Sequence, residues 1–243
     1  MSRYNIQLPK KENQDPFEDF EGNKAELYLH KFSHYLGNHR KQVFIGIGVV
    51  IFLLVSLAGF LEYQRDRLEK ASVEMEDLQT RFSKNPSIDL SEMIVEYEKV
   101  REKYSTSGVD LRTAKVLADL YARDGKFDKA AALMEKSGTE VGELREVKAF
   151  YFFIAGNYRE QQGDLKKALE NFETASGLLK NMRNVPVLMS WSYFHTGRLY
   201  FLNKDTAKAN TYLKKVLEVN GSTPLFQKAR KLSTYLLLKI NQG

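Results

Sequence analysis

Cysteine is absent from the 243-residue sequence. Disulfide bonds, thiolate metal sites and a cysteine nucleophile are therefore excluded. The absence fits any compartment, and an oxidising one slightly better, because no free thiol can mispair there. The sequence also lacks the GxSxG, P-loop, HExxH and EF-hand signatures of common enzymes and metal proteins. It predicts no catalytic residue, no metal site and no cofactor.

Charge of one sign is not concentrated in any long run. The formal net charge is +6, but basic and acidic residues are interspersed almost everywhere. Nucleic-acid-binding domains carry dense basic patches or stripes. We therefore expect no nucleic-acid partner and interpret the charges as a solvated helix surface.

The chain has one long hydrophobic run, VFIGIGVVIFLLVSLAGFL, at residues 43–61. About 20 apolar residues in a helix span a hydrocarbon core of ~30 Å. The run predicts a single transmembrane helix. A cleaved signal peptide fits less well, because the segment before the run is too long and no clean cleavage site follows.

The two flanks of this predicted span are nearly equal in basic residues. Three precede the span and three follow it: Lys31, Arg40 and Lys41 before, and Arg65, Arg67 and Lys70 after. The N-terminal flank has no acidic residue after Leu27. We expect the N-terminus in the cytoplasm and the C-terminal domain on the far side of the membrane.

The residues before the span divide into two parts. Residues 1–24 are polar and contain two prolines, which predicts a disordered cytoplasmic tail. In residues 25–42, Leu27, Phe32, Tyr35 and Leu36 fall near one helical face. This pattern predicts an amphipathic pre-membrane helix that lies at the membrane surface.

Three histidines lie in the same segment, at His30, His34 and His39. His30 and His34 are four residues apart, a spacing that can hold a metal ion. No acidic residue lies between them, so we interpret them as interfacial residues rather than metal ligands.

Residues 62–83 predict a stalk helix after the span. Leu61, Leu68, Met75 and Phe82 recur every seven residues. This spacing is compatible with a coiled-coil homodimer and also with a helix that packs on its own chain. The second interpretation is favoured, and both stay open at this stage.

Residues 87–243 are helical in pattern to the C-terminal end. No run of alternating β-branched residues predicts a strand, so we expect an all-α domain. Near its end, Thr223 is placed to cap a helix that begins with Pro224.

One short phrase occurs three times in this region, as GKFDKAAALM, GDLKKALENF and KDTAKANTYL. Each copy joins two small residues that are twelve positions apart: Ala118 and Ala130, Gly156 and Ala168, Gly197 and Ala209. Small side chains let antiparallel helices cross closely, so the spacing predicts three helical hairpins. The turns fall at Gly125, Gly163 and Lys204. Lys204 departs from the glycine pattern, although Asn203 just before it also tolerates a left-handed conformation.

These hairpins resemble the tetratricopeptide repeat, which has small-x-x-Tyr on its first helix and Ala-x-x-x-Phe on its second. Tyr121 and Tyr200 match, whereas the middle copy has Arg159. The copies are 38 and 41 residues apart, longer than the family's repeat of about 34. Over residues 110–220 the resemblance implies an α-solenoid of such hairpins following the transmembrane helix.

The order of short tail, single span and degenerate repeats is similar to a bacterial family of inner-membrane proteins with a periplasmic tetratricopeptide-like domain. That family includes the ancillary subunit of the Sec translocon. The similarity implies an inner-membrane location with a periplasmic repeat domain. It also implies contact with the translocation machinery and with periplasmic chaperones or their clients.

The resemblance further implies a partner-binding groove on the concave face, lined by the first helices of the hairpins. The groove positions fall on Arg112, Lys115, Asp119, Arg123, Phe150, Phe153, Asn157, Glu160, Gln161, Trp191, Phe194, Arg198, Phe201 and Leu202. Aromatic residues beside Arg198 would suit an apolar peptide segment with an acidic contact. The same aromatics could instead pack against the C-terminal helix, and His195 is interpreted as a core or groove side chain.

Two functions follow. The first is a membrane-anchored, non-enzymatic module that binds peptides or partner proteins, as an adaptor or in a chaperone-like role at the translocation machinery. The alternative is a structural assembly subunit that oligomerises through its stalk helix.

Overall fold

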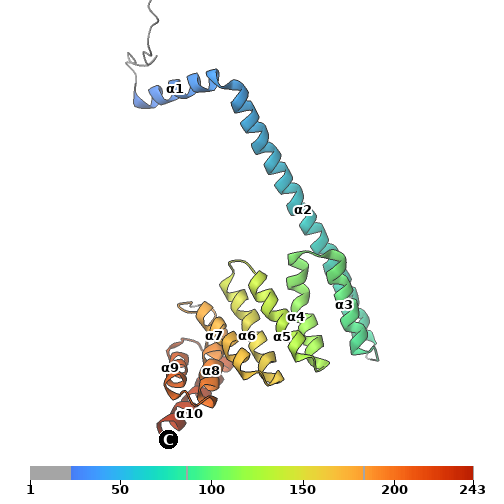
Figure 1. Ribbon diagram of the computed structural model, residues 1–243, viewed down its shortest axis with the longest axis vertical. Coiled ribbons are helices and arrows are strands. Elements are labelled where there is room, and N and C mark those ends of the chain that lie inside the picture. The colour runs from blue at the N-terminus through green and yellow to red at the C-terminus, as the bar shows by residue number, and fades with distance from the viewer. Residues whose placement is uncertain (1–22, 86, 183, 243) are drawn as a thin grey trace, which may run out of the picture. The chain divides into compact units, whose positions relative to one another are not determined.

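The computed structural model describes residues 23–85, 87–182 and 184–242, and Figure 1 shows their arrangement. These residues form helices and no strand. The helices are α1 (Lys24–Asn38), α2 (Arg40–Lys84), α3 (Leu90–Tyr104), α4 (Ser107–Arg123), α5 (Phe127–Glu140), α6 (Arg145–Gln162), α7 (Leu165–Leu178), α8 (Pro186–Leu202), α9 (Thr206–Glu218) and α10 (Pro224–Gln242). The predicted all-α class is confirmed.

The helix boundaries before residue 85 differ from the predicted ones. The helix expected over residues 25–42 ends at Asn38, and α2 begins at Arg40. The predicted span and the predicted stalk are one continuous helix, α2, because no proline or capping sequence separates them. The tail predicted for residues 1–24 lies outside the described residues except for its last two, and so does the side chain of His30.

The division between two compact units falls between Glu62 and Tyr63, inside α2. In the first unit, α1 starts with a capping box: the Asn23 side chain accepts from the Ala25 amide, and Glu26 accepts from the Asn23 amide. The N-terminal part of α2 contains the apolar run. By length and composition this helix can cross a membrane, and no other residue that the structure describes covers its most apolar window.

The second unit is built from antiparallel helical hairpins. α4 pairs with α5, α6 with α7 and α8 with α9, and α10 packs on the last pair (Figure 1). A Cβ atom on Gly156 would lie 2.8 Å from the Phe172 ring, and one on Gly197 would lie 2.8 Å from Leu213 Cγ. Gly156 and Gly197 therefore sit where the first helix of each of these two hairpins packs closely on the second, and Ala168 and Ala209 are fully buried, in line with the twelve-residue spacing.

The three hairpin turns use left-handed backbone conformations. Gly125 and Gly163 have φ angles of +73° and +89°. At the third turn Lys204 itself has a φ of +62°, whereas Asn203 has a φ of −79°. The left-handed residue is therefore Lys204, the position at which the turn was predicted. A lysine tolerates it at a cost of roughly 1–2 kcal/mol, which the packing of the hairpin outweighs.

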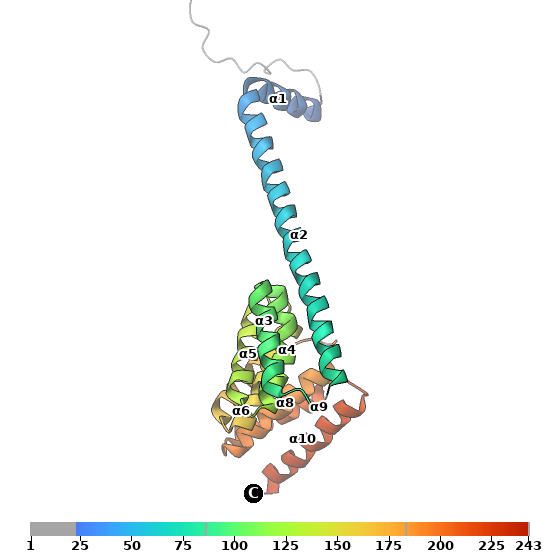
Figure 2. The same ribbon diagram turned by 90° about the vertical axis from the view of Figure 1, so that its right-hand side faces the viewer.

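The C-terminal part of α2 packs with α3 as a further helical pair ahead of the three hairpins. Ala71, Leu78 and Phe82 are buried in the same core as Tyr97 and Val100 of α3. Lys103 and Tyr104 of α3 both donate to Glu74 of α2. The turned view in Figure 2 also shows α3 beside this part of α2. The heptad residues Leu68, Met75 and Phe82 thus pack on their own chain, whereas Leu61 lies in the first unit and is 58% exposed.

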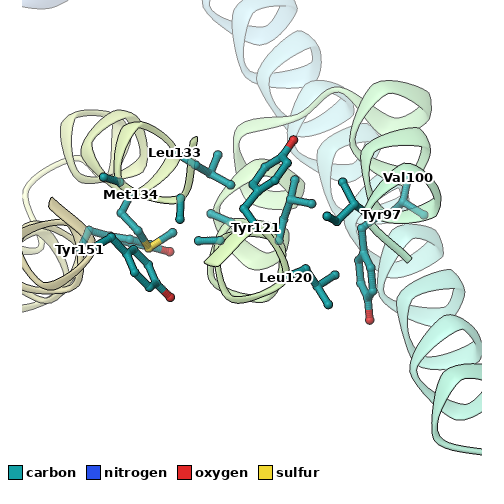
Figure 3. Close-up of a cluster of buried hydrophobic side chains, with 14 of the residues drawn as sticks. Tyr97, Val100, Leu120, Tyr121, Leu133, Met134 and Tyr151 are labelled. Carbon is teal, nitrogen blue, oxygen red and sulfur yellow. The ribbon is translucent and has the colours of Figure 1, made fainter. Parts of the chain in front are cut away.

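One core continues from this pair into the hairpins. Figure 3 shows Tyr97 and Val100 of α3 facing Leu120 and Tyr121 of α4, followed by Leu133, Met134 and Tyr151 of the next helices. Because each pair of helices buries its apolar face against the next, the hairpins stabilise one another along the stack.

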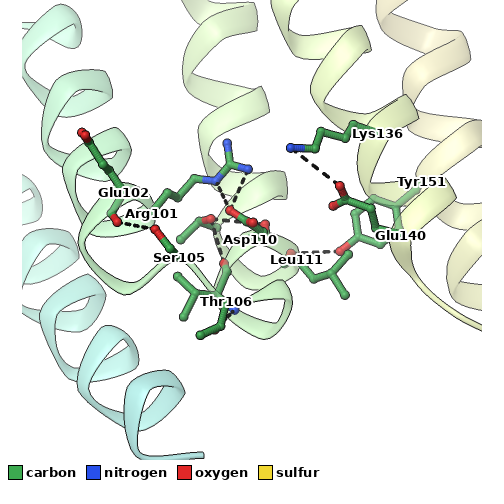
Figure 4. Close-up of polar contacts among 11 residues, drawn as sticks. Arg101, Glu102, Ser105, Thr106, Asp110, Leu111, Lys136, Glu140 and Tyr151 are labelled. Atoms are coloured by element: carbon green, nitrogen blue, oxygen red, sulfur yellow. Dashed lines mark hydrogen bonds and ion pairs between the residues drawn. The ribbon is translucent and has the colours of Figure 1, made fainter. Parts of the chain in front are cut away.

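Polar contacts fix the junction between α3 and α4. Arg101 binds Asp110 through Nε and Nη2 at 3.0 and 2.9 Å, across the turn at Ser105 (Figure 4). Thr106 caps α4 by accepting from the Val109 amide at 3.4 Å. At the chain's other end, Thr223 accepts from the Phe226 amide at 3.3 Å at the start of α10, as predicted.

Candidate partner-binding groove

An apolar groove lies where α6, the segment before α8 and the start of α10 meet. Its volume is about 550 Å³. The residues that line this apolar groove are Phe150, Phe153, Asn184, Val185, Pro186, Val187, Leu188, Trp191 and Leu225. Phe150 is 38% exposed and Leu225 is 59% exposed, so the groove presents apolar side chains to the outside.

Three of the predicted groove residues line this cavity: Phe150, Phe153 and Trp191. The sequence prediction did not include residues 184–188 or Leu225. The sequence did contain a feature that could have predicted them. The apolar run VPVL around Pro186 and the leucine after Pro224 both stand at helix starts, where apolar side chains border loops rather than the core of a hairpin.

Phe194 differs from its prediction. It is 6% exposed and belongs to the core that α8 shares with α9 and α10. Its ring meets Trp191 edge to face, with centroids 5.6 Å apart. Phe194 therefore supports Trp191 from behind and offers no free surface to a partner.

His195 lies within the aromatic cluster beneath the groove. Its ring stacks on Phe172 at 4.8 Å and lies 5.7 Å from both Phe153 and Trp191. Burial lowers the pKa of His195 to about 4, Arg198 acts in the same direction and Glu160 opposes both. The imidazole is therefore neutral near pH 7 and acts as a packing group, in agreement with the interpretation of His195 as a core or groove side chain.

Arg198, expected to offer a contact to an acidic partner, already has one. It is ion-paired with Glu160 of α6, and its Nη2 is also 3.0 Å from His195 Nδ1. The Asn157 amide donates to the Phe153 carbonyl at 2.8 Å. The pair of Arg198 with Glu160 joins α8 to α6, whereas the Asn157 contact stays within α6.

The predicted residues of α4 lie apart from the apolar groove. Lys115 pairs with Asp119, which also accepts from Tyr158, and Arg112 donates to Ser72 Oγ at 2.6 Å. Asp119 and Arg123 border a separate hollow of about 350 Å³ between α2, α3 and α4. The remaining predicted residues, Gln161, Phe201 and Leu202, do not line the apolar groove.

A series of carboxylates on the second helices was missed by the sequence prediction. Tyr121 donates to Glu98 and Tyr200 donates to Glu173, each on the preceding helix pair. In the middle repeat Arg159 takes the same role, binding Glu135 through Nε and Nη2 at 2.8 and 2.6 Å. We call these three contacts the carboxylate ladder. The signal was a Glu directly after the bulky residue in YE, ME and FE at positions 97, 134 and 172.

The carboxylate ladder is partly buried, and this burial together with its hydrogen bonds shifts the pKa values of its members. Burial and the bond to Glu98 raise the pKa of Tyr121 to about 12. Burial opposes ionisation of Glu135, but the bonds from Arg159 and Asn171 outweigh it and hold the pKa of Glu135 below its ordinary value. Glu135 is therefore a charged acceptor, and Arg159 replaces tyrosine without breaking the ladder.

A comparison with family models matches residues 192–223 to the tetratricopeptide repeat. These residues are α8 from its second turn, α9 and the whole loop that leads to α10. A solved structure of a putative kinesin light chain with nearly identical TPR-like repeats, from Podosopora anserina, superposes with a TM-score of 0.50. The two are 17% identical, over 73% of this chain and 85% of that one. The fold is a tetratricopeptide-like α-solenoid.

A second similar structure is BtubC (BKLC) from P. vanneervenii, with a TM-score of 0.44 and 16% identity over 74% of this chain and 90% of that one. None of the curated proteins compared with the chain matches it. The tetratricopeptide-like fold supports protein partners as the class of ligand.

Proposed function

We propose that this chain is a membrane-anchored, non-enzymatic module that binds an apolar segment of a partner protein in the apolar groove. The observation that carries the proposal is the groove itself, in which two exposed apolar side chains, Phe150 and Leu225, flank the half-buried Trp191. Tetratricopeptide-like solenoids bind partners on the face of their first helices, and α6 and α8 are first helices.

The anchor is the apolar part of α2. Its large side chains from Phe44 to Leu61 are between 51% and 72% exposed. Water would not favour so much uncovered apolar surface, whereas a bilayer covers it. We place the N-terminus in the cytoplasm and the tetratricopeptide-like domain in the periplasm of a bacterial inner membrane. The architectural resemblance adds an adaptor or chaperone-like role at the translocation machinery.

The surroundings of the groove favour a partner that carries acidic residues beside the apolar segment bound in the groove. α10 carries exposed basic residues and, from residue 224 to 242, no acidic one: its basic residues are Lys228, Arg230, Lys231 and Lys239. Lys228 is one helical turn beyond Leu225 and shares its face. The sequence analysis assigned the contact with an acidic residue of the partner to Arg198. Because Arg198 is already paired with Glu160, we assign that contact to the basic residues of α10 instead.

The oligomerisation alternative has less support. The residues that would form its seam, Leu68, Met75 and Phe82, pack against α3 and α4 in the core of the same chain. A coiled-coil dimer would have to remove them from that core.

Fluorescence of Trp191, the single tryptophan of the chain, tests the groove. A short peptide with a central Leu-Leu-Phe flanked by glutamates is expected to shift the emission of the full chain in micelles saturably. Leu225→Asp is expected to weaken this binding about tenfold or more, because it places a carboxylate against the apolar centre of the peptide. A tenfold loss of affinity is about 1.4 kcal/mol of binding free energy.

Leu238→Asp is the matched control. It lies on the same helix, is 55% exposed and does not line the groove. Equal binding by the two variants, or equal binding of a peptide whose apolar centre is replaced by serine, would refute the proposal. Equal binding of a lysine-flanked peptide would refute only the acidic preference.

A further inference from the structure

The helix α1 has a continuous apolar face that no other part of the described chain covers. Its large side chains on that face are 57–73% exposed: Tyr28, Leu29, Phe32 and Tyr35. At 100° per residue they fall within one third of the helix circumference, and Ala25 and Leu36 fall in the same arc. Outside this arc lie Glu26, Ser33 and Gly37, and also Leu27, which was predicted on the apolar face but falls on the other side of the helix.

The charge of this region is positive. Residues 24–42 contain four basic residues and one acidic residue, a net charge of +3 with histidines neutral. The single acid, Glu26, accepts a hydrogen bond from the Asn23 amide at 3.1 Å and lies at the positive end of the helix. α1 is thus aromatic on one side, with Lys24 at its start and Lys31 in its middle, and Arg40 and Lys41 follow at the start of α2.

The position of α1 points to what covers this face. α1 ends at Asn38 and α2 begins at Arg40, three residues before the apolar run. A span that holds α2 in a bilayer keeps α1 at the surface of that bilayer, so docking there is intramolecular. Aromatic side chains with polar tips, such as Tyr28 and Tyr35, favour this interface.

We propose that α1 lies in the interface of an anionic lipid bilayer, with Tyr28, Leu29, Phe32 and Tyr35 at the acyl boundary and its basic residues at the headgroups. The occupant of the face is an anionic lipid surface. This inference rests on the membrane anchoring proposed above and adds a second attachment point with its own lipid preference.

The absence of cysteine allows the helix to be mapped by single spin labels in the full chain. Phe32→Cys reports the apolar face, and Ser33→Cys is its neighbour outside that face. Ala25→Cys reports the apolar face with every aromatic side chain intact. Phe52→Cys lies in the apolar run and reports the span itself. Each variant is reconstituted in phosphatidylglycerol and phosphatidylethanolamine vesicles.

The measurement is the collision rate with oxygen, which concentrates in the bilayer, relative to a neutral nickel chelate, which stays in water. Labels at 25 and 32 are expected to show a ratio several-fold above that of the label at 33. In vesicles of phosphatidylcholine this contrast is expected to fall by about half or more, because the headgroup attraction is lost.

Three results would overturn the inference. Equal ratios at 32 and 33, with 52 in the bilayer, mean that α1 is not docked although the span holds. Spin–spin broadening at 32 means that a second copy covers the face. Unchanged contrast in phosphatidylcholine refutes the anionic preference. A label at 52 in water instead refutes the proposed anchor, which separates the two failures.

Discussion

Replacing Glu135 with alanine is expected to destabilise the tetratricopeptide-like domain by about 3 kcal/mol. The change leaves Arg159, whose side chain is 9% exposed, as an uncompensated charge inside the stack. Removing one partner of a buried ion pair costs roughly 3–5 kcal/mol, and the lower end applies because Glu135 is 27% exposed. Urea unfolding of the full chain in micelles, followed by Trp191 fluorescence, measures the loss.

Two further variants give this result its meaning. Arg159→Tyr is expected to cost less than about 1 kcal/mol, because Tyr121 and Tyr200 make the equivalent contact in the neighbouring repeats. Lys136→Ala removes an exposed pair with Glu140 at 3.6 Å and is expected to change stability by less than about 0.5 kcal/mol. If Arg159→Tyr were as damaging as Glu135→Ala, the three contacts of the carboxylate ladder would not be equivalent.

Acidification is expected to weaken the domain through His195. The pKa of His195 is about 4 in the fold, against about 6.5 in an unfolded chain. Between these pH values the unfolded state binds more protons than the folded state. The contribution of neutral His195 to the free energy of unfolding is therefore fully present above pH 6.5 and is lost as the pH falls toward 4. The full loss is about 3 kcal/mol, and about 2 kcal/mol of it is reached at pH 5.

The contribution of His195 is isolated by comparison with His195→Phe, which keeps an aromatic ring against Phe172 and does not titrate. Carboxylates titrate in the same range in both proteins, so the quantity to compare is the change in unfolding free energy between pH 7 and pH 5. The wild type is expected to lose about 2 kcal/mol more than the variant. Parallel losses would show that the imidazole is not desolvated in the fold.

Most of the fold could be predicted from the sequence, because the geometry of a helical hairpin depends on the spacing of residues that are close together in the chain. Gly156 is small because the Phe172 ring of the second helix lies where its Cβ would be, and this close approach recurs at a fixed spacing along the chain. The third turn falls at Lys204 as predicted, although this lysine is held in a left-handed conformation that its own propensity disfavours. Whether the heptads of α2 pair within or between chains depends on α3, which periodicity alone does not reveal.

The site could be predicted only in part, for reasons visible in α8. This helix is apolar on all sides, so its pattern does not separate the buried Phe194 from the partly exposed Trp191. Leu225 joins the groove because α10 packs across α8, a contact between residues far apart in sequence. Predicting the carboxylate ladder requires knowing which residues of successive hairpins face each other. The sequence pattern did not reveal this register, because the middle repeat has Arg159 where the other two have tyrosine.

The apolar groove as the partner-binding surface is tested most directly by photo-crosslinking in the native membrane. A photoreactive phenylalanine analogue replaces Phe150 in the groove or, as the control, Leu165 at the start of α7; both positions are 38% exposed. Position 150 is expected to give defined protein adducts that disappear when Leu225→Asp is added, and position 165 to give none that depend on Leu225. Adducts from position 150 that persist with Leu225→Asp, or that are no stronger than those from position 165, would contradict a binding role for the groove.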